Sequence, residues 1–177
     1  MIAKVFNRLS LAGLCATLVG NGLGRFAFVA LMPALIQAGW FSQAQASTLG
    51  VATLVGYVLG AALAHPLASR WSSARLLRWA MLVCSLSFVA CAVEGAGMAW
   101  NLAWRGAAGA CGALLMVLPA PLILPRHEAA IRARASGVVF SGIGLGAALS
   151  GLLVPLLVAG FGAAAAVNAS GPRVPAG

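Results

Sequence analysis

Two arginines carry the clearest chemistry in this sequence, because each lies inside a long apolar segment. Arg25 is the only charged residue between Leu9 and Leu35, and Arg105 lies in the apolar segment that begins at Met98. An arginine near the centre of a membrane-spanning helix costs about 2.5–3.5 kcal/mol on insertion scales, so a function is expected of it. Its planar fork of N–H donors suits a carboxylate or a phosphate. We therefore predict that both arginines bind an anionic solute.

The neighbours of these arginines add candidates for the same site. Asn21 lies in the glycine-rich stretch just before Arg25, and Tyr57 lies between Gly56 and Gly60 in the next apolar segment. We predict that the amide and the hydroxyl also face a polar cavity and bind substrate. A structural alternative stays open, in which each guanidinium donates to helix carbonyl groups and clasps neighbouring helices.

The sequence offers no set of residues for catalysis, for a cofactor or for a metal. It contains no aspartate, and its two acids are Glu94 and Glu128. The four cysteines lie in apolar segments without a Cys-x-x-Cys motif, so packing is favoured over disulfide or metal binding. The pair His127-Glu128 is interpreted as solvated, which leaves Glu94 as the one weak candidate for carrying a proton. We expect neither an enzyme nor a cofactor.

Composition places the chain in a membrane. Hydrophobic residues make up 62% of its 177 residues and charged residues 7%, whereas a soluble domain carries about 25% charged residues. The net charge of +9 does not indicate a nucleic-acid partner, because the basic residues form neither a dense tract nor a face with interleaved aromatic residues. The expected partners are the lipid bilayer and a small-molecule solute.

Five segments are long and apolar enough to cross a bilayer, whose hydrocarbon core takes roughly 20 helical residues. They are about residues 9–35, 46–64, 76–93, 98–122 and 135–161. None shows the two-residue alternation of a membrane β-barrel, so the predicted fold class is an all-α, polytopic helical bundle. We assign residues 1–161 to this bundle and expect residues 162–177, which contain Pro172 and Pro175, to be a disordered tail.

The basic residues between the segments predict the orientation. They precede the first segment, follow the second and follow the fourth, whereas the two short loops on the other side carry none (Lys4, Arg8, Arg70, Arg75, Arg78, Arg126, Arg132 and Arg134). Loops rich in lysine and arginine stay in the cytoplasm. We therefore predict a multi-pass protein of the bacterial inner membrane whose N-terminus is cytoplasmic.

Three stretches of sequence occur in the order found in one transporter family. They read GLGRFAF and then LMP from Gly22, LGVATLVGYVLG from Leu49, and SGVVFSGIGLG followed by LSGL from Ser136. They resemble the first, second and fifth helices of the YbfB-type transporters of the major facilitator superfamily. The similarity covers most of residues 10–160.

The resemblance also extends to two shorter motifs. Arg70 and Arg75 fit the superfamily's conformational loop between the second and third helices, but Ser69 stands where that loop has an aspartate. The carboxylate that helps to lock one conformation in the family is therefore missing here. Arg105 and Gly109 match the motif of the family's fourth helix.

The resemblance implies a transporter and a relation between the two arginines. Each half of such a transporter contains inverted three-helix repeats, which makes the first and fourth helices counterparts and places Arg25 and Arg105 at similar depth. A complete member has two six-helix halves around its substrate. We therefore expect this chain to be the amino-terminal part of a secondary transporter that works by alternating access, with a second half that is missing or separately encoded. The alternative is a truncated membrane protein that transports nothing, or a scaffold for helix packing.

Overall fold

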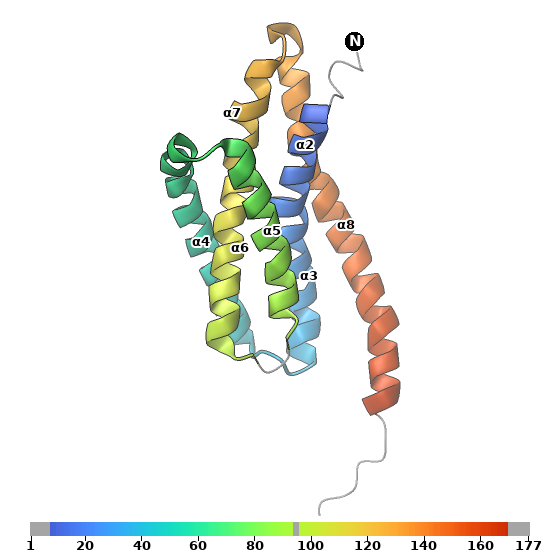
Figure 1. The fold of residues 1–177 in the computed structure, drawn as a ribbon. Coiled ribbons are helices and arrows are strands. Elements are labelled where there is room, and N and C mark those ends of the chain that lie inside the picture. Colours follow the sequence, from blue (N-terminus) through green and yellow to red (C-terminus); the bar gives the residue numbers. More distant parts are fainter. Residues whose placement is uncertain (1–7, 94–95, 170–177) are drawn as a thin grey trace, which may run out of the picture.

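The computed structural model describes residues 8–93 and 96–169 of the chain (Figure 1). Within these ranges the regular structure is helical and contains no strand. Five helical stretches in the described ranges are long and apolar enough to cross a membrane: Arg8–Gln37, Gln43–Arg70, Ser73–Cys91, Met98–Arg126 and Ile131–Gly160. The predicted all-α, polytopic fold class is confirmed.

The first stretch is not one uniform helix. It consists of α2 (Arg8–Thr17), the π-helix η1 (Leu18–Leu23) and α3 (Gly24–Gln37). At the junction the backbone N–H of Gly24 donates to the carbonyl of Val19, five residues back. Such widened turns are rare and are often found at functional sites. This one coincides with the glycine-rich stretch before Arg25.

The other elements follow the predicted segments with shifted ends. They are α4 (Gln43–Arg70), α5 (Ser73–Cys91), α6 (Met98–Val117), α7 (Pro119–Ile123), the 3-10 turn η2 (Leu124–Arg126) and α8 (Ala129–Ala169). Helix α4 begins earlier than expected because Ser42 and Gln45 form a capping box. Helix α8 continues to Ala169, past the expected end at residue 161. Residues 170–177 lie outside the described part.

Helices α4 and α6 pack with almost no space between their backbones. A side chain at Gly56 would collide with the carbonyl of Gly106, and one at Gly60 with the carbonyl of Ala110. A side chain at Gly109 of α6 would collide in turn with the carbonyl of Thr53. Small residues allow such close approach between membrane helices. The pair α4–α6 is therefore a tightly packed unit.

The first membrane stretch packs just as closely against α8. A side chain at Gly146 would collide with the backbone of Gly22, and one at Gly142 with the carbonyl of Leu14. The hydroxyl of Thr17 donates to the carbonyl of Val139 across the same interface. Glycines and one hydrogen bond thus fix η1 and α2 on α8 in the middle of the bundle.

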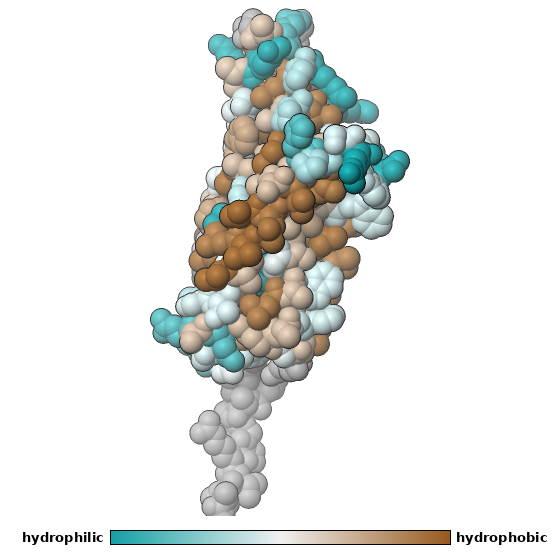
Figure 2. Space-filling model, turned by 90° about the vertical axis from the view of Figure 1, so that its left-hand side faces the viewer, coloured by the Kyte–Doolittle hydropathy of each residue, from teal (hydrophilic) through white to brown (hydrophobic). Residues whose placement is uncertain are grey.

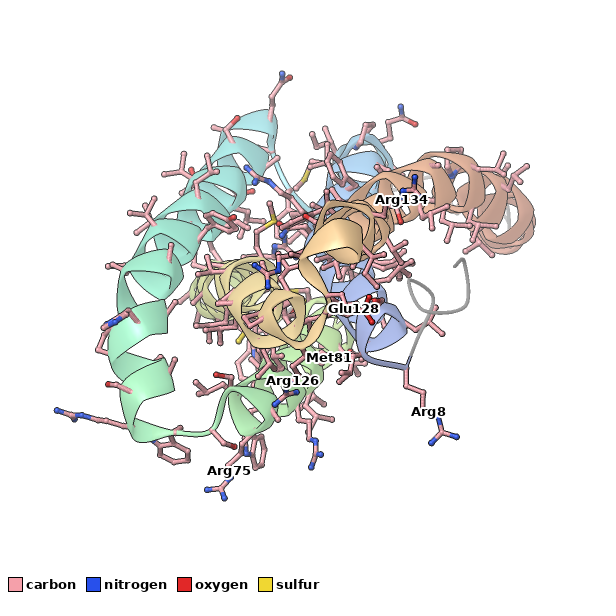
Figure 3. The ribbon with its side chains drawn as sticks, turned by 90° about the horizontal axis from the view of Figure 1, so that it is seen from above. Arg8, Arg75, Met81, Arg126, Glu128 and Arg134 are labelled. Atoms are coloured by element: carbon pink, nitrogen blue, oxygen red, sulfur yellow. The ribbon has the colours of Figure 1, made fainter. Side chains whose placement is uncertain are left out.

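The surface divides into an apolar middle and two hydrophilic ends. Figure 2 shows the apolar band across the middle of the molecule and hydrophilic residues above and below it. Arg8 begins α2, Arg75 lies in the first turn of α5, Arg126 ends η2 and Arg134 lies near the start of α8, and Figure 1 shows these parts of the helices toward one end of the bundle. Figure 3 looks down on this end and labels the four arginines, which are spread around it. We call this the basic end. A broad apolar surface between polar ends is what a lipid bilayer requires of a helical bundle.

Candidate functional site

The two arginines inside the membrane stretches line one cavity. Its volume is about 180 Å³, and it lies between α3, α4 and α6. Arg25 and Arg105 contribute the charges, and the remaining lining residues are apolar or small apart from one threonine (Phe28, Val29, Gly50, Thr53 and Leu54). Ligand pockets for drug-sized molecules usually measure about 300–1,000 Å³. This cavity therefore suits a small solute.

Arg105 is the more deeply buried of the two, with 2% of its surface exposed. Its Nε donates to the hydroxyl of Thr53 on α4 at 3.3 Å, and its Nη2 donates to the carbonyl of Gly24 on α3 at 3.5 Å. The ring of Phe28 stacks on the guanidinium, with its centroid 3.7 Å from Cζ. Such contact with an aromatic face stabilises a cation. Two hydrogen bonds and one ring therefore hold the guanidinium in a fixed orientation.

One nitrogen of Arg105 is left without a partner. Its Nη1 is the only buried side-chain nitrogen or oxygen without a hydrogen bond among the described residues. An unsatisfied buried polar group typically costs about 1–3 kcal/mol, and more when it is charged. The structural alternative, in which a guanidinium donates to helix carbonyl groups, is thus present, because Nη2 donates to a helix carbonyl. This contact uses only some of the N–H donors of Arg105. Spare donors on a buried cation favour an anionic partner.

Arg25 is held more loosely than Arg105. It is partly exposed, and its Cζ lies 5.7 Å from the centroid of the Tyr57 ring. A second space of about 10 Å³ lies beside it, lined among others by Asn21, Thr53 and Tyr57. That volume matches a single water molecule. Arg25, at the rim of the site, therefore has fewer contacts that fix its guanidinium than Arg105 has.

The remaining predicted site residues divide into two groups. Asn21 and Tyr57 lie beside Arg25, as expected, although the Asn21 amide also donates to the sulfur of Met116 at 3.1 Å. Arg70 and Arg75 lie elsewhere, exposed at the end of α4 and the start of α5. Tyr57 and Arg70 are thirteen residues apart on α4, which corresponds to about 20 Å along a helix. The two groups cannot contact one solute together.

Sequence reasoning missed Phe28 and Thr53, the two side chains that orient Arg105. Both are ordinary residues of apolar helices, and only the packing of α3 and α4 against α6 brings them to the guanidinium. Trp104, the neighbour of Arg105 in the sequence, packs edge-on against Trp100 with the ring centroids 5.8 Å apart. The aromatic partner of Arg105 comes from another helix instead.

A larger cavity lies away from the arginines and brings no charges together. It measures about 400 Å³ at the end opposite the basic end, and its described lining residues are uncharged, including Trp40, Phe41 and Asn101. No group of three histidine, cysteine or acidic residues that could hold a metal occurs among the described residues. The cavity with Arg25 and Arg105 is therefore the better candidate site.

Comparison with known proteins gives one match. A family model described as "Uncharacterised MFS-type transporter YbfB" matches residues 17–169, a range that includes both arginines and all the elements from η1 to α8. Neither the curated proteins nor the solved structures gave a match.

The anchoring of Arg105 predicts a specific loss of stability in Thr53→Val. Valine keeps the shape of threonine but leaves Nε of Arg105 unpaired, which should destabilise the protein by about 1–3 kcal/mol. Thr48→Val is the matched control, because Thr48 also donates to the carbonyl four residues back but is exposed and does not contact Arg105. Thermal unfolding of the purified proteins in one detergent measures the difference. Equal losses in both variants would show that the contact with Arg105 contributes nothing.

Proposed function

The chain belongs to the family of YbfB-like, MFS-type transporters, and on that premise we propose that its bundle forms part of a secondary transporter for a small organic anion. The family is one of membrane transporters rather than enzymes. The observation that carries the choice of solute is the single cavity lined by Arg25 and Arg105. A cofactor plays no part in the proposed transport.

The charge balance of the cavity supports an anion. Two guanidiniums meet there, and neither acid of the sequence is among the described lining residues. Uncompensated cations in a low-dielectric interior are expensive, so a bound anion stabilises this arrangement more than a neutral solute would. The walls of Phe28, Val29 and Leu54 favour an apolar body attached to the anionic group.

The position of the cavity supports a second bundle opposite this one. Val29 and Leu54 on its rim are 63% and 48% exposed, so the cavity opens to the outside of the bundle. A partly exposed Arg25 at that depth would face hydrocarbon unless other protein covered it. We propose that a second set of helices, in the same or a separate polypeptide, closes the site.

The packing supports alternating access as the mechanism. Backbone-to-backbone contacts hold α4 on α6 and η1 on α8 as two rigid pairs. The arginine cavity lies where α3 meets the pair α4–α6. Rocking of one bundle against the other would expose such a site to each side of the membrane in turn. In this proposal Arg70 and Arg75, which lie at the turn between α4 and α5, would contact the moving partner.

Binding of small carboxylates to the purified chain tests the anion site at Arg25 and Arg105 directly. Benzoate should raise the midpoint of thermal unfolding of the purified chain, whereas benzamide, which has a similar shape and no charge, should not. Arg25→Lys and Arg105→Lys should each remove the effect of benzoate because lysine lacks the planar fork. Arg134→Lys, at an exposed position on α8, is the control and should behave like the parent protein.

Two results would contradict the proposal. One is equal stabilisation by benzamide and benzoate, and the other is a benzoate effect that survives both substitutions of the buried arginines. A chain that binds none of a panel of small carboxylates, and takes none up in proteoliposomes, would favour the alternative of a scaffold that transports nothing.

The distribution of arginines supports an inner-membrane protein whose basic end is cytoplasmic. Gln43 and Ser69 are exposed near the two ends of α4, which makes them a matched pair of reporters. In a cysteine-free variant expressed in intact bacterial cells, Gln43→Cys should react with an impermeant thiol reagent and Ser69→Cys should not. The reverse pattern would overturn this orientation.

A further inference from the structure

One glycine of the stretch LGVATLVGYVLG has no role in the packing of α4 against α6. Side chains at Gly56 and Gly60 would collide with the backbone of α6, but a Cβ at Gly50 would meet nothing within 4 Å in the described part of the chain. Gly50 is exposed, and it lines the cavity that contains Arg25 and Arg105. Glycine inside a helix is unfavourable relative to alanine. Helix packing gives no reason for glycine at this position, whereas the cavity does.

Gly50 lies on the face of α4 that is turned toward the two arginines. The hydroxyl of Thr53 accepts from Nε of Arg105, and the ring of Tyr57 lies 5.7 Å from Cζ of Arg25. Gly50, Thr53 and Tyr57 follow one another at the three- and four-residue spacing of a single helix face. Three residues correspond to about 4.5 Å along a helix, so position 50 lies nearly one turn from the contact between Thr53 and Arg105. A side chain there would begin inside the same cavity.

The lining of the cavity divides into a buried charged part and an exposed apolar part. Arg105 is buried, and Phe28 and Thr53 hold its guanidinium in place. Val29 and Leu54 are exposed, as Gly50 is, and they form the apolar rim. A solute whose anionic group reaches Arg105 therefore places its apolar part on this rim, beside Gly50.

The size of the cavity fits one ring. Its volume is about 180 Å³, and Phe28, Val29 and Leu54 supply its apolar walls. An engineered protein cavity of about 150 Å³ with leucine, isoleucine and phenylalanine walls binds benzene. The space here therefore accepts a single six-membered ring with a small anionic group. A second, fused ring would have to displace a side chain or protrude from the cavity.

We propose that the solute is a carboxylate with a single apolar ring, and that the missing side chain at Gly50 sets this size limit. This inference rests on the proposed function, the binding of a small organic anion. The carboxylate accepts from Arg105 and Arg25, and the ring lies against Gly50 between Val29 and Leu54. A larger residue at position 50 takes the place of the ring but leaves both guanidiniums as they are. It should therefore convert the cavity into a site for a shorter carboxylate.

Binding of acetate, benzoate and 2-naphthoate to the full chain in lipid nanodiscs tests the size limit. Dissociation constants are measured by nuclear magnetic resonance of the ligand protons. The parent protein should bind benzoate roughly tenfold more tightly than either of the other two, since burying a few additional carbons in a fitted pocket has an effect of this size. Gly50→Leu should remove the preference for benzoate and leave the binding of acetate unchanged. Gly50→Ala, which adds one methyl group, should give an intermediate loss.

The glycine substitutions are suited to this test because they should not impair folding. Position 50 is inside a helix and has open space around its Cβ, and both alanine and leucine have a higher helix propensity than glycine. Gly144→Leu is the matched control. Gly144 on α8 is also exposed, its Cβ would also meet nothing within 4 Å among the described residues, and it does not line the arginine cavity. This variant should bind benzoate as the parent does.

The outcomes separate the size limit from the anion function. Unchanged benzoate binding in Gly50→Leu, an equal loss in Gly144→Leu, or a loss of acetate together with benzoate in Gly50→Leu would each overturn the role of Gly50. A parent protein that binds 2-naphthoate or acetate as tightly as benzoate would overturn the single-ring class, while the anion function would stand. A parent protein that binds none of the three carboxylates would remove the anion function itself.

Discussion

The arrangement of this bundle depends on one buried cation, the guanidinium of Arg105. It is separated from solvent, stacked on Phe28 and bonded to Thr53 and to the carbonyl of Gly24, yet its Nη1 has no partner within the described structure. A charge in that position must be compensated, since desolvation without a partner costs several kcal/mol, on the order of the whole margin of stability. Three helices converge on it, and the only other charge that lines its cavity is also positive.

Glycine makes that convergence possible. Thr53 reaches Arg105 because α4 lies directly on α6, and the close approach requires glycine at Gly56 and Gly109. On the other side, Gly22 and Gly146 fix η1 against α8 and so set the direction in which α3 leaves the π-helix. The polar site is therefore built by small residues in the apolar interfaces, where lipid offers no hydrophobic drive for association.

The fold class and the five spans could be predicted from sequence, because hydropathy over about 20 residues is a local signal. The expectation that Arg25 and Arg105 lie at similar depth came from the resemblance to the transporter family, whose first and fourth helices are counterparts. The π-helix, the stacking of Phe28 and the burial of His127 could not be predicted from sequence. Each depends on which faces of distant helices meet, as in the 3.1 Å contact between Ser10 and His127. The end of α8 also differs from the predicted end at residue 161, since the helix continues through the alanine-rich stretch to Ala169.

The most direct measurement of the central claim is a titration of the arginine side chains observed by nuclear magnetic resonance. In nanodiscs that contain the chain labelled with nitrogen-15 arginine, the Nε signals of Arg25 and Arg105 are assigned by the corresponding lysine substitutions. Benzoate should shift both signals with one common dissociation constant, and benzamide should shift neither. Benzoate-induced shifts confined to the exposed arginines of the basic end would contradict the account, because the anion would then bind outside the cavity.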